Sequence, residues 1–246
     1  MPESIRLSVI IPAYNEELRL ADTLRTVDSY LSAQPYESEI IVVDDGSTDD
    51  TPRVVRACET VKSLRLIQHP DGANHGKGAS VRRGMFEARG AYRIFMDADN
   101  STTIDQIAGF WPCFDRGYDV VIGSRRKRGA RIEVHQSWCK ELAGRFGNLV
   151  IRCLAVPGIK DTQAGFKMFT SRSAEAVFRR QTIDRWGCDI ELLAIAGQLG
   201  YRIQEVPIVW INAPGSKVRL ISYLEVLSEA WRVRRNIKSG IYLRPA

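Results

Sequence analysis

Two aspartates separated by one residue, Asp97 and Asp99, follow directly after the apolar run Tyr92–Met96. Neighbouring carboxylates repel each other, and a hard divalent cation relieves that repulsion because it prefers oxygen ligands. Mg²⁺ or Mn²⁺ held in this way can bridge a diphosphate and stabilise it as a leaving group. An Asp-x-Asp pair is also common in solvated turns, so whether this pair binds a metal depends on which other groups the fold places beside it.

Groups that could bind phosphate lie in two further segments. Asn74–Gly78 is rich in glycine and leads into a helical pattern, so its backbone N–H groups and Lys77 could contact a phosphate. Its spacing matches neither the phosphate loop of ATPases nor the Gly-x-Gly-x-x-Gly turn of dinucleotide-binding folds. Arg125 opens a second segment, residues 125–152, which holds eight basic and two acidic side chains.

The elements that would position these groups alternate between strand and helix. Short apolar runs predict strands, and apolar residues at helical spacing predict helices between them. This alternation predicts an α/β fold with a doubly wound, mostly parallel sheet and helices on both faces. We expect one domain over residues 1–246, with a nucleotide-binding half (1–124) and an acceptor-binding half (125–246). The predicted strands are 7–11, 40–43, 64–67, 92–96, 120–122, 168–169 and 203–210, and the predicted helices are 17–31, one beginning at 48–52, 78–88, 105–114, 133–156, 189–199 and 221–237.

Polar residues follow four of these strands at the point where each strand ends. They are Tyr14–Glu16, Asp44–Asp45, Asp97–Asp99 and Ser124–Arg125. Ligands of open parallel sheets bind at the carboxyl ends of the strands, so we expect these groups to meet at one edge. The sequence therefore predicts a nucleotide site there.

Composition and charge exclude several classes of protein. The net charge is +6, but residues 1–124 alone carry 13 basic and 19 acidic side chains. The longest run without a charged residue, 206–216, is too short for a membrane span, and residues 1–6 have no apolar signal core. The five cysteines form no Cys-x-x-Cys pair, which indicates reduced thiols in a cytoplasmic protein. No aromatic residues are interleaved in the run 125–128, so we do not expect nucleic acid as a partner.

Several longer motifs carry a resemblance to known enzymes. Ser8–Glu16, Val42–Ser47, the Asn-x-Gly-Lys-Gly loop and Asp97–Asp99 resemble the inverting GT-A glycosyltransferases. Motifs in the second half narrow the resemblance to the dolichyl-phosphate β-glucosyltransferases, whose relatives are the polyprenyl-phosphate mannosyltransferases. These motifs are Gly123–Arg125, Ile159–Lys167, Arg185–Leu193, Glu205–Ile208 and Gly215–Lys217.

The resemblance implies roles for individual residues. Pro12, Tyr14, Glu16 and Asp45 would hold the nucleoside, with Asp45 recognising the base. Lys77 would lie near the nucleotide, Asp97 and Asp99 would hold Mg²⁺ or Mn²⁺ with the diphosphate, and Arg125 would bind the acceptor phosphate. The remaining residues expected to line the substrate site are Asp44, Gly76, Ala98, Arg131, Lys140, Gln163 and Lys217.

The implied activity is inverting transfer of a hexose, glucose from UDP-glucose, to a polyprenyl or dolichyl phosphate, which gives a β-linked product. A phosphate acceptor is already an anion near pH 7, so no general base is required.

Mannose transfer from GDP-mannose is an alternative, but Ser101, Lys140 and Asn212 depart from the mannosyl pattern. A soluble transferase with a hydroxyl acceptor is another, and it would need a base such as Asp161, Asp189 or Glu191. A non-catalytic nucleotide-sugar binding module is the third, and intact Asp97, Asp99 and Arg125 argue against it.

The last predicted helix is amphipathic and ends in a basic tail. Leu220, Leu224, Leu227 and Trp231 recur at helical spacing, and residues 232–246 hold five basic residues and no acidic one. We expect this helix to attach the protein peripherally to the cytosolic face of a membrane, because anionic lipids attract basic residues near the surface. The alternative is that the stripe packs on the core.

Overall fold

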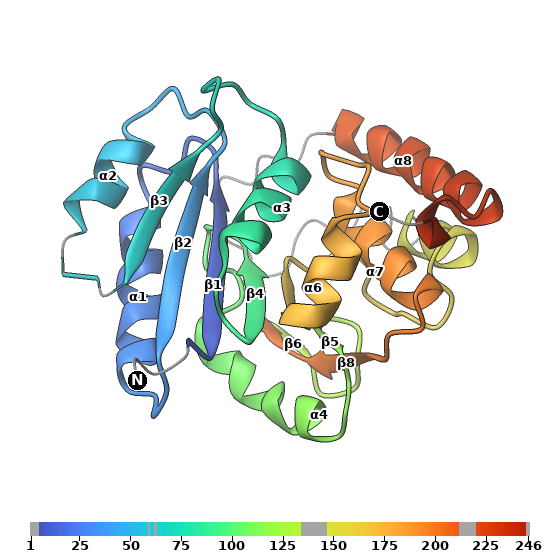
Figure 1. The fold of residues 1–246 in the computed structure, drawn as a ribbon, viewed down its shortest axis with the longest axis horizontal. Helices are drawn as coiled ribbons and strands as arrows, with labels where there is room; N and C mark the ends of the chain where they lie inside the picture. The colour runs from blue at the N-terminus through green and yellow to red at the C-terminus, as the bar shows by residue number, and fades with distance from the viewer. Residues whose placement is uncertain (1–4, 59, 62, 134–146, 212–219, 245–246) are drawn as a thin grey trace.

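A seven-stranded sheet forms the centre of the molecule (Figure 1). The structure, a computed structural model, describes residues 5–58, 60–61, 63–133, 147–211 and 220–244. The strand order is β3-β2-β1-β4-β7-β5-β8, and every neighbouring pair is parallel except those that β7 makes with β4 and β5. A separate two-stranded ribbon pairs β6 with β9. The strands are β1 (Leu7–Ala13), β2 (Ser38–Asp44), β3 (Leu64–Gln68), β4 (Tyr92–Met96), β5 (Val120–Ser124), β6 (Arg131–Ile132), β7 (Phe166–Thr170), β8 (Ile203–Pro207) and β9 (Val209–Trp210).

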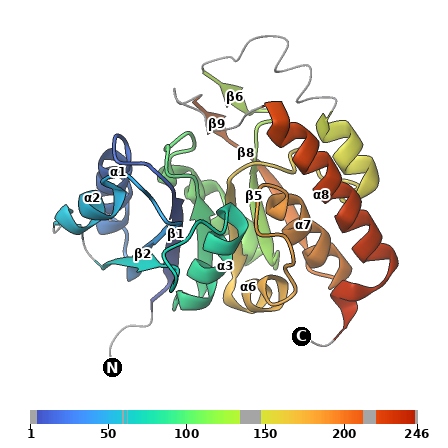
Figure 2. The ribbon, with the colours of Figure 1, turned by 90° about the horizontal axis from the view of Figure 1, so that it is seen from above.

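Helices cover both faces of this sheet, as Figures 1 and 2 show. One face carries α1 (Leu20–Ser32), α2 (Thr51–Ala57), the 3₁₀ turn η1 (Ile104–Gly109) and α4 (Trp111–Asp115). The other carries α3 (Lys77–Glu87), α6 (Ser171–Phe178) and α7 (Cys188–Gln198), with α8 (Leu220–Lys238) packed outside α7. Residues 147–154 form a further helix, and a 3₁₀ turn, η2 (Ile241–Leu243), follows α8.

Sequence periodicity accounts for the two apolar layers. In β1, Val9 and Ile11 enter the layer beneath α1, whereas Ile10 enters the layer beneath α3, because successive strand residues point to opposite faces. In α1, Leu20, Leu24, Val27 and Leu31 are all buried, at the spacing of one helix face. In each layer, buried apolar residues therefore recur at every second position in strands and about every 3.6 positions in helices.

The mostly parallel α/β sheet predicted from the sequence is confirmed, and the differences from the predicted elements have local causes. The predicted helix 105–114 is divided into η1 and α4, because Pro112 lacks the N–H that an unbroken α-helix needs. The predicted strand 203–210 is likewise interrupted after Pro207, where the chain leaves the large sheet and β9 joins β6. The predicted helix 133–156 is observed over residues 147–154, and residues 134–146 lie outside the described residues. No prediction covered α6.

The C-terminal helix α8 packs on the core through a face that includes Leu227 of the predicted stripe but not Trp231. Val226, Ala230 and Val233 are buried, and Leu227 packs against the same apolar cluster. Trp231, in contrast, is 63% exposed. The other two leucines of the predicted stripe have side chains outside the described residues. Of the predicted stripe, Leu227 therefore belongs to the core, and Trp231 points to solvent.

Candidate active site at the carboxyl edge of the sheet

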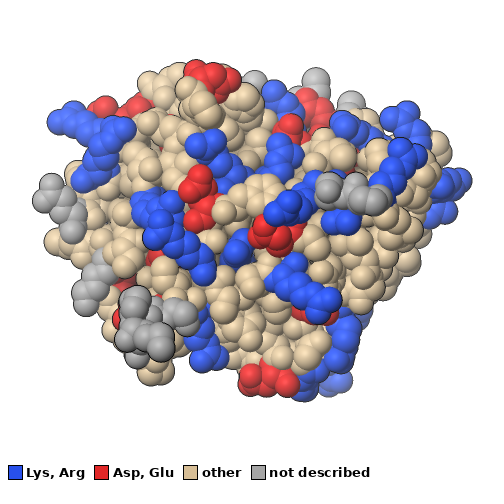
Figure 3. All heavy atoms as spheres, in the orientation of Figure 1, with Lys and Arg blue, Asp and Glu red and all other residues tan. Residues whose placement is uncertain are grey.

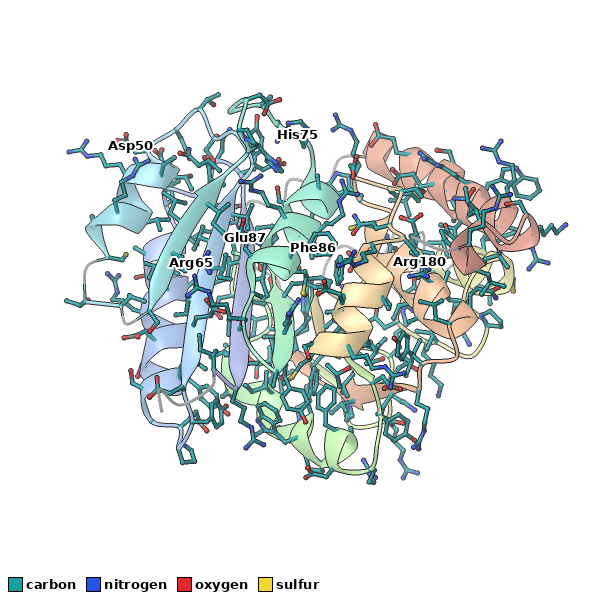
Figure 4. The ribbon with its side chains drawn as sticks, viewed as in Figure 1. Asp50, Arg65, His75, Phe86, Glu87 and Arg180 are labelled. Carbon is teal, nitrogen blue, oxygen red and sulfur yellow. The ribbon has the colours of Figure 1, made fainter. Side chains whose placement is uncertain are left out.

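The four polar clusters predicted from the sequence follow strands of one sheet, and contacts across its carboxyl edge bring their residues together. In Figure 4, the labelled Asp50 lies beside the start of α2 and the labelled His75 in the loop before α3, both toward the upper edge of the sheet. Arg65 and Glu87, an ion pair at 3.1 Å between Nη2 and Oε2, lie further down the strands. The site is therefore built from loops at the upper edge of that view.

The Asp45 carboxylate fastens the glycine-rich loop to the end of β2. It accepts hydrogen bonds from the backbone N–H groups of His75 and Gly76, each at 2.9 Å, and from the Asn74 amide at 2.9 Å. Gly76 has φ of +99°, and a Cβ there would lie 2.6 Å from the Asp184 carbonyl oxygen, so only glycine fits. Asp45 thus positions the loop that precedes Lys77, a role that the sequence did not predict.

The other predicted nucleoside residues lie on the loops beside β1 and β2. Asp44 is fully buried and accepts hydrogen bonds from Ser47 N at 3.2 Å and from Gln68 Nε2 at 2.9 Å. Glu16 is paired with Arg19, and its N–H donates to Thr51 Oγ1 at 2.6 Å. Pro12 is half-buried within β1. Tyr14 is 38% exposed, so its ring can offer a flat face to a base. Among these residues Tyr14 has the freest access to solvent.

Asp97 and Asp99 stand at the end of β4, next to a lysine from α3. Lys77 Nζ lies 2.8 Å from Asp97 Oδ1 and 3.4 Å from Asp189 Oδ2. Asp99 Oδ1 accepts a hydrogen bond from Ser101 N at 3.0 Å. The carbonyl of the intervening Ala98 accepts one from Thr23 Oγ1 at 2.8 Å, which fastens the loop to α1. Burial raises the pKa of the Asp97 carboxyl and the charge of Asp99 raises it further, while Lys77 opposes both.

A loop from the second half of the chain closes against Asp97. A Cβ on Gly165 would lie 2.0 Å from Asp97 Oδ2, so the absence of a side chain there permits the close approach. Gln163, half-buried, lies in the same loop. The loop runs directly into β7, which is hydrogen-bonded to β4. The loop of Asp97–Asp99, which was predicted to hold the diphosphate, therefore contacts the 161–165 loop.

A buried ion network beneath Asp97 went unpredicted. Lys167 is fully buried in β7, and its ammonium group donates to Asp189 Oδ1 and to the Ala164 carbonyl. The ammonium groups of Lys77 and Lys167 lie 5.9 and 5.5 Å from the centre of the Phe95 ring. A lysine inside the apolar run Phe166–Phe169 is the signal that could have revealed this network, because buried lysines need charged partners.

Arg125, at the end of β5, is held by a buried aspartate. Its Nε and Nη2 lie 2.8 and 2.9 Å from the two carboxylate oxygens of Asp161, and its backbone N donates to Asp161 Oδ2 at 2.9 Å. Burial alone would raise the pKa of Asp161, but Arg125 overcomes it and lowers that pKa to about 2. Asp161 is itself fixed by Glu205, which accepts hydrogen bonds from the backbone N–H groups of residues 160 and 161.

The Arg125 guanidinium also lies over an indole. Its central carbon is 5.5 Å from the centre of the Trp210 ring, and the side chain is 27% exposed. Trp210 is in β9, which pairs with β6, so the exposed Arg131 of β6 belongs to the same corner of the molecule. Lys140 and Lys217, predicted for the substrate site, lie outside the described residues.

The three carboxylates that could have served as a general base are all committed to other partners. Asp161 is 1% exposed and binds Arg125, and Asp189 is 3% exposed between two lysines, which lower its pKa against the effect of burial. Glu191 is fully buried and accepts hydrogen bonds from the backbone and hydroxyl of Thr182, from Ile183 N and from the Tyr242 hydroxyl. None of them is placed to take a proton from a substrate hydroxyl.

The two aspartates suit a divalent cation that shares its coordination with a diphosphate. Among residues outside the gaps given above, no group of three or more His, Cys, Asp or Glu side chains could hold a metal ion. Mg²⁺, however, is usually held by one or two carboxylates together with substrate phosphates and water. Asp97, 42% exposed, and Asp99, two residues further along the same loop, provide such a pair. The donor set therefore fits a cation that binds together with its substrate.

Comparison with known proteins points to one family. The sequence profile of the family described as glycosyl transferase family 2 matches residues 8–171. The human dolichyl-phosphate β-glucosyltransferase is 31% identical over 260 residues, which cover 95% of this chain and 79% of that protein. The enzyme of the same name from Drosophila melanogaster is 35% identical over 236 residues, which cover 87% and 70%.

Solved structures share the fold at lower sequence identity. Glucosyl-3-phosphoglycerate synthase from Mycobacterium tuberculosis, in complex with Mn²⁺, UDP and glucosyl-3-phosphoglycerate, has a TM-score of 0.68 at 20% identity and covers 96% of this chain and 80% of its own. Mannosyl-3-phosphoglycerate synthase from Rubrobacter xylanophilus has a TM-score of 0.69 at 18% identity, with 96% and 75% covered. At these identities the likeness shows the fold alone.

Proposed function

Since this chain belongs to glycosyl transferase family 2, we propose that it transfers glucose from UDP-glucose to a polyprenyl phosphate, with inversion to a β-linked product. The GT-A fold and the glycosyltransferase activity expected from the sequence are confirmed by the family match, the curated relatives and the structural neighbours. Relatives at about 30% identity over most of the chain are named for glucose transfer to dolichyl phosphate, which supports the choice of donor sugar and acceptor.

The commitment of Asp161, Asp189 and Glu191 to other partners carries the choice of a phosphate acceptor. A hydroxyl acceptor must lose its proton in the transition state, which requires a base within hydrogen-bonding reach. A phosphate monoester has a second pKa of about 6 and needs no such base. Because no acid of this group is free to accept a proton, the site favours an acceptor that arrives as an anion.

On the donor side, Asp97 and Asp99 would hold Mg²⁺ or Mn²⁺ together with the diphosphate. The bound ion would neutralise charge on the UDP leaving group. Tyr14, with its exposed ring, and the loop fixed by Asp45 would bind the nucleoside, and Lys77 would approach the diphosphate from α3. Positioning and electrostatic stabilisation are then the main contributions of the protein.

On the acceptor side, we assign the phosphate to Arg125. Asp161 uses the Nε and Nη2 edge of the guanidinium, which leaves the N–H groups of Nη1 and one of Nη2 for an anion. We expect Arg125→Lys to raise the acceptor KM or lower kcat, because lysine lacks the bidentate fork, while calorimetric UDP-glucose affinity changes little. Loss of donor binding with normal acceptor dependence would instead assign Arg125 to the diphosphate.

The test of the overall proposal is a matrix of donors and acceptors read out by product mass. UDP-glucose and GDP-mannose would each be offered with a polyprenyl phosphate and with the corresponding polyprenol, in Mg²⁺ and in Mn²⁺. We expect a product from UDP-glucose and the phosphate alone. A product from the polyprenol would contradict the phosphate-acceptor argument, and a product from GDP-mannose alone would replace the donor.

We also propose peripheral attachment to a membrane through α8. No helix in the described part of the chain has the length and apolar character needed to cross a bilayer. On the face drawn in Figure 3, Lys and Arg side chains reach the right-hand end, where Figure 1 places α8. Trp231 is exposed on that helix, and Arg232, Arg235 and Lys238 are exposed further along it. An exposed indole beside basic residues is suited to an anionic lipid surface.

Liposome flotation tests this attachment. We expect the protein to float with anionic vesicles at low salt and less at high salt, because the ionic attraction is screened. Trp231→Ala should reduce flotation. Because Trp231 is exposed, the same substitution should leave the free energy of unfolding unchanged. No flotation at low salt would contradict membrane attachment through this helix.

A further inference from the structure

The lysine beside Asp97 occupies the place where a metal-bound diphosphate is expected. Lys77 Nζ is 2.8 Å from Asp97 Oδ1, closer than to its other partner, Asp189, at 3.4 Å. Its side chain is 13% exposed, and that of Asp97 is 42% exposed, so this ion pair lies at the accessible border of the buried network. The side chains of Lys167 and Asp189, deeper in the network, are 0% and 5% exposed.

The net charge of this network differs between binding of the metal alone and binding of the metal together with the donor. Asp97, Asp99 and Asp189 carry three negative charges, and Lys77 and Lys167 carry two positive ones, which leaves −1, because the neighbouring pairs Arg125–Asp161 and Arg19–Glu16 are each neutral. A divalent cation alone would change this to +1, next to an ammonium group already on Asp97. A cation together with the diphosphate of a nucleotide sugar, which carries −2, returns it to −1, and the terminal phosphate of free UDP makes the sum more negative still. The network is therefore balanced for the two ligands jointly.

The second partner of Lys77 allows it to leave Asp97 without becoming an unpaired buried charge. Asp189 lies between both lysines, so it can keep the Lys77 ammonium group nearby while Asp97 is released. A lysine carries a compact charge on a flexible four-carbon stem, which makes a short movement of its ammonium group easy. Lys77 is also the first residue of α3, immediately after the loop held by Asp45.

We propose that Lys77 neutralises Asp97 in the donor-free enzyme and moves to the donor diphosphate when nucleotide and metal bind, so that tight metal binding depends on the donor. This inference rests on the proposed function only for the class of donor, a nucleoside diphosphate. In the donor-free enzyme, Lys77 would compete with the metal for Asp97. In the complex with metal and nucleotide, Lys77 would bind the diphosphate. By thermodynamic linkage, UDP raises metal affinity by the same factor as metal raises UDP affinity.

The test measures Mn²⁺ and UDP binding, with no acceptor and no transfer reaction. Mn²⁺ affinity would be determined from the paramagnetic resonance of free Mn²⁺, with and without UDP, and UDP affinity by calorimetry in Mn²⁺. We expect Lys77→Met, which keeps the length of the stem without the charge, to bind Mn²⁺ alone about tenfold more tightly or better. Its UDP affinity in Mn²⁺ should fall about tenfold, because the diphosphate loses a cation.

Two controls separate a local effect from a change in total charge. Lys77→Arg keeps the positive charge, so its Mn²⁺ affinity without UDP should not rise. Arg172→Met removes an exposed cation of α6, to which no role is assigned, and should bind both ligands as the parent does. Unchanged Mn²⁺ affinity in Lys77→Met would overturn the proposal.

The parent protein provides a test that does not depend on folding of any variant. If Mn²⁺ binds the donor-free parent as tightly as it binds the UDP complex, Lys77 does not make metal binding conditional, and the proposal is wrong. Failure to transfer glucose to a polyprenyl phosphate would leave these binding results intact. Failure of UDP to bind the parent in Mn²⁺ would contradict the proposed donor, and the Mn²⁺ titration of Lys77→Met would still show whether the lysine blocks Asp97.

Discussion

Replacing Asp161 by asparagine should destabilise the protein near neutral pH and less so in acid. The substitution keeps the shape of the side chain but turns one carboxylate oxygen into an N–H donor that faces the donors of Arg125. Lowering the pKa of the buried Asp161 carboxyl from 3.8 to about 2 corresponds to about 2 kcal/mol of folding free energy. We therefore expect Asp161→Asn to reduce the free energy of unfolding at pH 7 by about 2 kcal/mol.

The pH dependence of this difference follows from the direction of the pKa change. A carboxyl group with a lowered folded-state pKa stabilises the fold fully above its unfolded pKa, near 4. That stabilisation decreases as the pH falls from 4 and is lost below the folded pKa, about 2. Urea unfolding of parent and variant at pH 7, 5, 4 and 3.5 should give a constant difference down to pH 5 and a smaller one below pH 4.

A matched control and a kinetic measurement complete this experiment. Asp105→Asn removes an exposed carboxylate and should change unfolding by less than about 0.5 kcal/mol. In Asp161→Asn, kcat/KM for the acceptor should fall about tenfold because Arg125 loses its anchor, with UDP affinity unchanged. Equal urea midpoints for parent and Asp161→Asn at pH 7, or a difference that does not shrink in acid, would refute the reasoning.

Two further substitutions test the loops that meet at Asp97. Asp99→Asn should cost about 3 kcal/mol of transition-state stabilisation, about a hundredfold in kcat, and excess chelator should abolish transfer by the parent; full activity in either case would rule out metal at these aspartates. Gly165→Ala would bring a Cβ within 2.0 Å of Asp97 Oδ2, so we expect about a hundredfold loss of transfer. Gly197→Ala, with open space around its Cβ, should retain full activity, and equal activities for the two alanine variants would contradict the close approach.

The sequence was sufficient for features that depend on local pattern. Strands β1 and β2 are apolar, β-branched runs and β4 is a mostly apolar run, and polar groups follow all three at their carboxyl ends. Parallel topology then brings Asp45, Asp97 and Arg125 to one edge without further information. The glycine-rich loop was also predicted to precede a helix, and α3 begins at Lys77.

The sequence was insufficient where partners are distant along the chain. Arg125 and Asp161 are 36 residues apart, and nothing local to either indicates that they pair. For Asp45 the resemblance implied a contact with the base, and nothing local indicated that its carboxylate also holds the loop before Lys77, 30 residues away. The antiparallel direction of β7 was also unpredicted, because strand propensity carries no information on direction or on neighbours.

Because β7 lies between β4 and β5, its position determines when the sheet can be completed during synthesis on the ribosome. Strands β4 and β5 are consecutive in the chain, yet neither can complete its side of the sheet until Phe166–Thr170 has been synthesised and inserted between them. Until then the nascent chain exposes the unpaired backbone groups of β4, a surface prone to pairing with other chains. A stall in translation between residues 124 and 166 should therefore yield fragments that aggregate or recruit chaperones, and this tendency should be lost only once β8, the other neighbour of β5, has also been synthesised.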